Sequence, residues 1–457
     1  MTARRAVPFV GPLVWAVACG AAYATISLVR FARMEVASYD NAIFQQAIAG
    51  YAHGRWPIVP IKGAGFNLLG DHFSPAIALV APFYRLFPRA ETLLVAQAVL
   101  VALSVYVIAS VALRTLGVRL GSLVAVTYGL SFGIQSALVA GFHEVAFGVP
   151  LLALAGAAFV ESRHAAVVGW SLPLLLVKED LGLTVAAIGV ALLLVRQWRR
   201  GLLLVVTGAA GTALVLFVLI PWARADSSGY AYALGGDGGL GALGDGLGQK
   251  AVTLLLTLAV GGLVAIASPW IVVALPTLAW RFAADNDHYW GTGWHYSLAL
   301  MPIVAIAAVD VLRRARSSRW SRPVGAVAMV AVTCLSVVPT PVITDPPVTR
   351  YLNPAAWRET ERERAAERVL ALIPSGAVVD SDIGLISHLV GQGRRVTWTG
   401  TQEVDGTPEW VVMDHDPASG ISSPQSATDY AEQRYGAVYR TVLRAYPFEV
   451  ARRVGAR

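Results

Sequence analysis

Long apolar runs recur along most of the chain and constrain its fold more than any other feature. Residues 8–30 and 91–113 each hold close to the ~20 apolar residues with which a helix crosses the hydrocarbon core of a membrane. Charged residues make up 14% of the 457 residues, whereas soluble domains carry about 25%. We therefore predict a mainly α, polytopic membrane protein.

Arginine-rich loops predict the topology, because cytoplasmic loops carry an excess of Lys and Arg. Arg4 and Arg5 place the N-terminus in the cytoplasm. The later inner loops hold Arg114, Arg119, Arg163, Arg196, Arg199, Arg200, Arg313, Arg314, Arg316, Arg319 and Arg322. About eleven transmembrane helices then place the C-terminus outside. We expect a transmembrane domain at residues 1–339, with a large first external loop at residues 31–90.

The run at residues 165–195 is interrupted near its middle by Lys178, Glu179 and Asp180. Arginines flank the run, so both of its ends are cytoplasmic and it must cross the membrane twice. Each half has ~15 residues, about 22 Å as a helix, whereas the hydrocarbon core is ~30 Å thick. We therefore expect the three charged residues at a recessed outer apex, which implies a water-filled cavity.

The first external loop contains the segment with the most informative polar residues. Residues 39–49 are predicted to form an amphipathic helix, with Ser38 as N-cap, Asp40 in the first turn and Gly50 as the stop. Asp40 either interacts favourably with the helix dipole or acts as a catalytic carboxylate beside a membrane-embedded cavity. Residues 76–87 are apolar but too short to cross, so we expect an interfacial or re-entrant segment.

The composition changes at Thr340, and residues 340–457 are predicted to form a small extracytoplasmic α/β domain. Predicted strands cover residues 377–379, 395–398 and 410–413, and predicted helices cover residues 354–373, 382–389 and 427–435. Residues 340–457 contain no GxGxxG, phosphate-binding loop or CxxC motif, and so this predicted domain gives no indication of a nucleotide or zinc site. Polar residues gather at the predicted strand ends, where they are usually solvated caps and less often ligand or metal contacts: Asp380, Asp382, Asp414, His415 and Asp416.

On this topology the unusual polar residues of the transmembrane domain all face the outer side. Besides Asp40, they are Asp71, His72, His143, Glu144, Lys178, Glu179, Asp180, Asp287, His288 and His295. Each alone could be an ordinary loop residue, and Lys178 could pair structurally with Glu179 or Asp180. Ionisable groups at membrane depth are costly, however, and their convergence on one side favours a substrate site.

These residue types suit the transfer of a group from a phosphate-activated donor. A carboxylate such as Asp40 can accept the proton of an attacking hydroxyl. Positive charge can offset a phosphate leaving group at Lys178, His72, His143 and His295. Flat aromatic faces either suit sugar rings or form an interfacial belt, at Tyr289, Trp290, Trp294 and Tyr296. The His and Asp clusters could also hold a divalent metal, although no certain cofactor is indicated.

Five sequence blocks occur in this order along the chain: YDNAIFQQAIAG, LGDHFSPAIALVAPFYRLFP, GFHEVAFGVPLLALA, KEDLGLT and WHYSLALMP. Together they resemble a bacterial membrane family known as domain of unknown function 2079. The resemblance covers most of the chain, including the tail. In the first block Asn41 and Gln45 stand where the family is expected to have Leu and Asp, which leaves Asp40 as the candidate functional carboxylate.

That family is in turn similar to the C-type superfamily of glycosyltransferases. Those enzymes are polytopic, use polyprenyl-phosphate sugars and carry a functional Asp or Glu in the first external loop. The resemblance implies this role for Asp40. From their residue types and shared side we expect substrate contacts at Asp71, His72, His143, Glu144, Lys178, Glu179, Asp180, His288, Trp294, His295 and Tyr296. It further implies a bacterial plasma membrane location, and a glycan, lipid or protein of the cell envelope as acceptor. We expect membrane lipids, and no nucleic acid, as further partners.

The sequence leaves three functions open. The first is a glycosyltransferase that acts on the outer face of the membrane. The second is a transporter or flippase for a lipid-linked or anionic substrate, in which the charged apex at residues 178–180 would couple transport to protons or substrate. The third is a non-catalytic envelope-assembly protein with the tail as a docking module. Alternating access needs polar groups on both sides, so their position on one side favours the enzyme.

Overall fold

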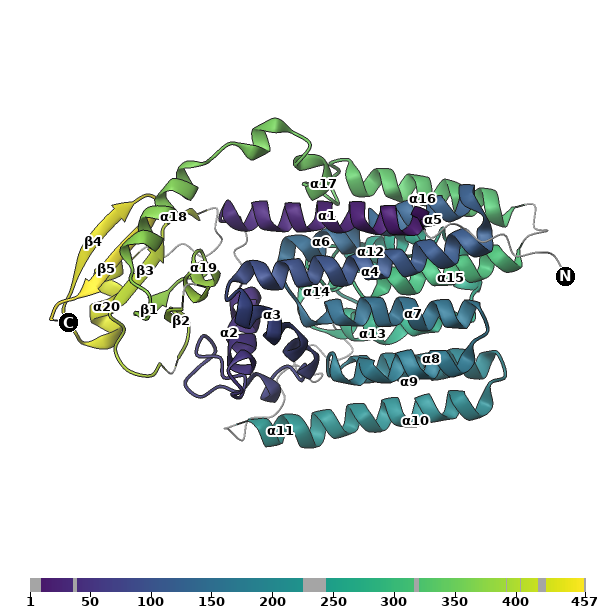
Figure 1. Cartoon of the computed structure of the whole chain (residues 1–457), viewed down its shortest axis with the longest axis horizontal. Helices are drawn as coiled ribbons and strands as arrows, with labels where there is room; N and C mark the ends of the chain where they lie inside the picture. Colours follow the sequence, from purple (N-terminus) through teal and green to yellow (C-terminus); the bar gives the residue numbers. More distant parts are fainter. Residues whose placement is uncertain are drawn as a thin grey trace.

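The structure is a computed structural model that describes residues 10–35, 39–224, 244–315, 320–391, 393–402, 404–417 and 425–455. The predictions on Arg4, Arg5, Ser38, Arg316 and Arg319 lie outside the described residues. A bundle of roughly aligned helices makes up most of the molecule, and a small domain with a mixed sheet lies at one end of it (Figure 1).

Four helices within the described residues are long and apolar enough to cross a membrane. They are α1 (Val10–Ala32), α4 (Ala90–Leu116), α5 (Val118–Gly129) continued by α6 (Phe132–Ala140), and α10 (Trp198–Leu214) continued by η5 (Val215–Leu219) and α11 (Ile220–Ala223). The mainly helical prediction is confirmed, whereas the number of about eleven transmembrane helices stays a prediction.

Shorter helices complete the bundle. They are η3 (Glu144–Phe147), α7 (Gly148–Val160), α8 (His164–Ser171), η4 (Leu172–Leu176), α9 (Leu181–Leu194), α12 (Leu247–Val260), η7 (Val264–Ala267), η8 (Pro269–Ala274), α13 (Leu275–Ala283), α14 (Asp287–Trp290), α15 (Leu300–Arg314) and α16 (Ser321–Val337). Every residue of α15 from Leu300 to Leu312 is buried, so this helix lies in the core of the bundle.

The predicted helical hairpin is present. The α8–η4 segment and α9 are its two arms, and Lys178, Glu179 and Asp180 lie in the turn between them. Glycines bring α9 close to α10, which lies beside it in Figure 1. A Cβ at Gly189 would come within 2.6 Å of the Gly201 carbonyl oxygen. Such small residues allow close helix packing where lipid supplies little drive for association.

The predicted helix that carries Asp40 is α2 (Tyr39–Ala52). Gly50 does not end it, contrary to the prediction. A Cβ at this position would lie 2.6 Å from the Trp56 carbonyl oxygen, so the glycine allows the chain to return close to the helix. The segment predicted as interfacial or re-entrant forms η2 (Pro75–Val80) and α3 (Ala81–Leu86), after η1 (Leu68–Gly70). Figure 1 shows α2 and α3 at the end of the bundle that faces the tail domain.

The tail sheet has the strand order β2-β1-β3-β5-β4. Its strands are β1 (Val378–Ser381), β2 (Arg395–Trp398), β3 (Trp410–Asp414), β4 (Tyr439–Ala445) and β5 (Phe448–Arg453). The pairs of β1 with β2 and β3 are parallel, and the pairs of β5 with β3 and β4 are antiparallel. The first three strands confirm the prediction. The β4–β5 hairpin was not predicted, because charged residues such as Arg444 and Glu449 interrupt the apolar alternation typical of a strand.

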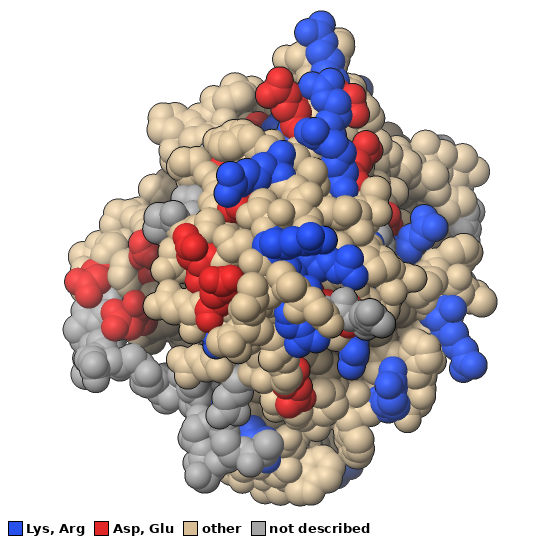
Figure 2. Space-filling view, turned by 90° about the vertical axis from the view of Figure 1, so that its left-hand side faces the viewer, with Lys and Arg blue, Asp and Glu red and all other residues tan. Residues whose placement is uncertain are grey.

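The tail helices are α17 (Pro347–Arg350), η9 (Pro354–Trp357), α18 (Glu361–Leu372), α19 (Ile386–Val390) and α20 (Ala427–Tyr435). The single helix predicted for residues 354–373 is wrong, because Thr360 starts a new helix and forms a capping box with Glu363. Only the second half of the helix predicted for residues 382–389 is helical, as α19. Figure 2 views the molecule from the tail end and shows basic and acidic side chains spread over that face, as expected of a surface in water.

Candidate functional site

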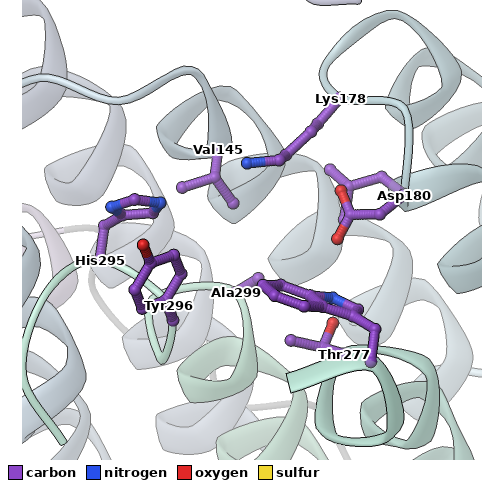
Figure 3. A pocket seen from close by; sticks show the side chains of 9 residues that line it. Val145, Lys178, Asp180, Thr277, His295, Tyr296 and Ala299 are labelled. Atoms are coloured by element: carbon purple, nitrogen blue, oxygen red, sulfur yellow. The ribbon is translucent and has the colours of Figure 1, made fainter. Parts of the chain in front are cut away.

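A small pocket lies where the α8–α9 turn meets the loop before α15. Its lining residues are Val145, Lys178, Asp180, Leu181, Thr277, Trp280, His295, Tyr296 and Ala299. Figure 3 shows Lys178 and Asp180 on one side of this pocket and His295 and Tyr296 on the other. The structure therefore brings together residues that the sequence places more than a hundred positions apart.

Lys178 is held in this pocket by a carboxylate from another element. Its Nζ lies 2.7 Å from Glu144 Oε1, and both side chains are largely buried. Glu144 is the first residue of η3, directly after His143. Lys178 lines the pocket, and its ion pair joins it to Glu144 and not to Glu179 or Asp180.

Asp40 meets the pocket through two stacked imidazoles. Its Oδ2 lies 3.2 Å from His143 Nε2, and the His143 ring stacks on that of His295 with centroids 3.6 Å apart. His143 is buried, whereas the Asp40 side chain keeps 46% of its surface exposed. A carboxylate that is held on one side and open on the other can contact a substrate hydroxyl.

The His143 ring is held through both of its nitrogen atoms. Its Nδ1 lies 3.2 Å from the Gly141 carbonyl oxygen, and its Nε2 lies 3.2 Å from Asp40 Oδ2. These two contacts fix the orientation of the ring beside the carboxylate, so Asp40 and His143 act as a pair.

Opposing effects set the pKa of Asp40. Burial of the carboxylate raises the pKa, but the hydrogen bond from His143 and the positive charges of His143, His72 and Lys178 outweigh burial. The pKa therefore lies below its usual range, and Asp40 is ionised at neutral pH.

His72 joins a second group of charges beside the first. Its Nδ1 lies 3.3 Å from Glu179 Oε1 and its Nε2 lies 3.6 Å from Asp71 Oδ2, while Lys62 pairs with the same Asp71 oxygen. Burial lowers the pKa of His72, but the hydrogen bond and charge of Glu179 and the charge of Asp71 outweigh it, so the net pKa is raised. His72 therefore holds a proton more readily than an ordinary histidine.

Several buried polar atoms around the pocket have no hydrogen-bond partner within the described residues. They are Glu144 Oε2, Asp180 Oδ1, Trp280 Nε1 and His295 Nδ1. An unpaired buried polar group costs about 1–3 kcal/mol, so this concentration indicates a site for a polar ligand or water.

Arg281 and Gln97 support the site but were not predicted from the sequence. The fully buried Arg281 donates to the carbonyl oxygens of Tyr289 (2.7 Å), Gly291 (2.7 Å) and Tyr296 (3.4 Å), which shapes the loop that carries His295. A charged residue inside the apolar run at 269–282 was the available signal. Gln97 in α4 accepts from the His143 backbone N at 2.9 Å, and its sequence context gave no signal.

Of the predicted substrate contacts, the pocket lining includes Lys178, Asp180, His295 and Tyr296. His288 and Trp294 belong neither to this lining nor to the charged groups described above. Both side chains are exposed, and their rings lie 5.9 Å apart. Trp290 is buried, with Lys250 Nζ 4.2 Å from the centroid of its ring. Trp290 therefore offers no free face to a sugar, whereas stacking on Trp294 stays a prediction.

The polar residues at the tail strand ends are internal structural groups. Asp380 accepts from Tyr430 and Tyr435 at 3.0 and 2.8 Å, and Asp414 pairs with Arg362. These carboxylates are buried, so the expectation of solvated caps is wrong for them. Asp382, which is also buried, accepts from the backbone N of Asp414.

No group of three or more His, Cys, Asp or Glu residues in the described part of the chain is arranged to hold a metal ion. No step of the chemistry below uses a metal ion. A divalent metal stays a prediction of the sequence.

A family model described as "Predicted membrane protein (DUF2079)" matches residues 30–445. The chain belongs to the DUF2079 family. The matched region holds the whole cluster around the pocket and nearly all of the tail domain. It confirms the resemblance drawn from the five sequence blocks, and with it an integral, multi-pass membrane protein.

No curated protein matches the chain. Among solved structures, this DUF2079 protein is similar to ArnT from Cupriavidus metallidurans bound to undecaprenyl phosphate. The two are 14% identical with a TM-score of 0.52, over 97% of this chain and 98% of that chain. At this identity the similarity shows the fold, and it extends over bundle and tail together.

Proposed function

We propose that this protein transfers a sugar from a polyprenyl-phosphate donor to an acceptor at the outer face of the membrane. The observation that carries the proposal is the half-exposed Asp40, held by His143 beside the Lys178 pocket. The similar fold of a protein solved with undecaprenyl phosphate supports the class of donor. Asp40 is the base, and the acceptor is a glycan, lipid or protein of the cell envelope.

The reaction follows from the positions of the charges. An acceptor hydroxyl attacks the anomeric carbon of the donor sugar, the bond from that carbon to the phosphate oxygen breaks, and Asp40 takes the hydroxyl proton. The polyprenyl phosphate leaves with the bonding electrons. Lys178, and His72 with its raised pKa, stabilise the negative charge that develops on the phosphate.

The proposal includes the finer topology. The chain crosses the membrane about eleven times, with a cytoplasmic N-terminus and with residues 340–457 as an extracytoplasmic domain. The end of the bundle that carries α2 and the tail domain then faces outward (Figure 1). On this orientation α2, with Asp40, lies on the side where lipid-linked sugars meet envelope acceptors.

Donor consumption tests the proposal. Purified protein in lipid nanodiscs is incubated with a panel of polyprenyl-phosphate sugars, and release of polyprenyl phosphate is followed by mass spectrometry. We expect one donor to be consumed by wild type. Donor movement across sealed proteoliposomes without any consumption would instead support the transporter or flippase, and binding without either would support the assembly protein.

A further inference from the structure

The backbone that carries His143 is held by two side-chain amides. Residues 141–143 form a non-helical break between α6 and η3, where backbone N–H groups need partners from elsewhere. Phe142 N donates to Asn41 Oδ1 at 3.3 Å, and His143 N donates to Gln97 Oε1 at 2.9 Å. The His143 ring is thus positioned from α2 on one side and from α4 on the other.

Asn41 also contacts the tail domain. Its Nδ2 donates to Ser387 Oγ of α19 at 3.3 Å, and both side chains are buried. The next residue of α19, His388, stacks on Phe31 at 3.8 Å and bonds its carbonyl oxygen through Nε2 at 2.9 Å. The tail helix is therefore anchored both at the outer end of α1 and on α2, one residue from Asp40.

We propose that Asn41 is a positioning residue through which the tail domain sets the geometry of the Asp40–His143 pair. The Asn41 amide bridges Ser387 of the tail to Phe142, the neighbour of His143. The adjacent Asp40 forms a hydrogen bond with the His143 ring. The consequence for catalysis rests on the proposed function, whereas the mechanical link does not. The tail domain is then part of the active-site architecture and more than a docking module.

Gln46 provides a matched control on the same helix. It too is an amide that contacts the tail, because its Nε2 donates to the Val396 carbonyl oxygen at 2.8 Å. Its Oε1 accepts from Ile61 N at 3.1 Å, within the first external loop. Gln46→Leu therefore loosens the contact between α2 and the tail without removing a bond to residues 141–143.

Hydrogen exchange measured by mass spectrometry on the full chain in nanodiscs tests the link without any activity. We expect Asn41→Leu to speed exchange in peptides covering residues 141–147 roughly two- to tenfold, as for the loss of one hydrogen bond. Ser387→Ala, which leaves Asn41 in place, should speed exchange there in the same direction. Gln46→Leu should leave these peptides unchanged.

The proposal is overturned if Ser387→Ala speeds exchange in α19 alone, or if Gln46→Leu loosens residues 141–147 as much as Asn41→Leu. Should Asn41→Leu fail to fold, the comparison of Ser387→Ala with Gln46→Leu decides the question. Either result is independent of whether the protein transfers a sugar.

The pH profile of turnover separates positioning from general stability. The groups that act on Asp40 are His143, His72, Lys178, Tyr289 and Tyr296. A displaced His143 removes a hydrogen bond that stabilises the Asp40 anion, so the acid limb of turnover should move to higher pH in Ser387→Ala, with KM little changed. If residues 141–147 exchange faster in Ser387→Ala but the acid limb of its pH profile does not move, the effect on catalysis is refuted, whereas the mechanical link stands.

Discussion

His143 Nε2 lies 3.2 Å from Asp40 Oδ2, although 103 positions separate the two residues in the chain. Asp40 lies in α2, and His143 lies in the break before η3. The imidazole orients the carboxylate, and its hydrogen bond and charge lower the pKa of that carboxylate. Neither residue has a defined role alone, and the predictions below treat them as one unit with the neighbouring Lys178 pocket.

Breaking the buried ion pair of Lys178 and Glu144 should have two independent effects, a lower free energy of unfolding and a lower affinity for the donor. Lys178→Met leaves Glu144 buried without its partner, so the free energy of unfolding should fall by about 3–5 kcal/mol. The double variant Lys178→Met/Glu144→Gln removes both charges and should recover most of that stability in thermal unfolding. It should still bind polyprenyl phosphate poorly, because the positive charge is lost.

Lys250→Met is the matched control for the lysine. Lys250 is buried against Trp290 and does not line the pocket. This variant should keep polyprenyl-phosphate binding close to that of wild type. Normal binding by the Lys178→Met/Glu144→Gln protein would remove Lys178 from the donor site.

His72 should make stability depend on pH. Its folded-state pKa is raised above the ordinary value of about 6.5, because Glu179 and Asp71 outweigh burial. A raised pKa stabilises the fold fully below about pH 6.5, and this contribution is lost as pH rises through the folded-state value. The Tm of wild type should therefore exceed that of His72→Gln by more at about pH 6 than at about pH 9.

His53→Gln controls for a histidine change in the same loop. The His53 side chain is exposed, and this variant should leave Tm close to wild type at both pH values. A Tm difference for His72→Gln that grows toward high pH would contradict the charged pairing with Glu179.

Sequence patterns predicted the elements that depend on local chemistry. The helix that holds Asp40, the hairpin around Lys178 and three tail strands follow from apolar periodicity and interrupted runs. The outer location of the charged residues, inferred from arginine-rich loops, stays a prediction. These patterns depend on neighbouring residues, so they can be recognised in a single sequence without information on tertiary packing.

The partners of these residues could not be predicted in the same way. Within its own turn Lys178 has Glu179 and Asp180 as possible partners, which the sequence left as an alternative, whereas its ion pair is with Glu144 from another element. His143 stacks on His295, and these residues lie in two loops that are far apart in the sequence. Their sequence positions alone do not indicate that the two rings are in contact. Asn41 departs from the expected family residue, and its role emerges only where the tail helix meets α2.

Cysteine labelling should test the proposed orientation. In a variant without Cys19 and Cys334, single cysteines at the exposed positions Leu352 and Tyr446 should react with an impermeant maleimide in intact cells. Cysteines at Val118 and Trp198, exposed at the opposite end, should react only after permeabilisation. Labelling of Val118 from outside would overturn the topology, and with it the outer location of the pocket.

Turnover by Asp40→Asn tests the central claim most directly. Asn keeps the shape of the side chain and a group that can bond His143, but it cannot take a proton from the acceptor. General-base catalysis contributes about 10²–10⁴-fold, so consumption of the accepted polyprenyl-phosphate sugar should fall by that factor while donor binding and Tm change little. Near-normal donor consumption by well-folded Asp40→Asn protein would contradict the account.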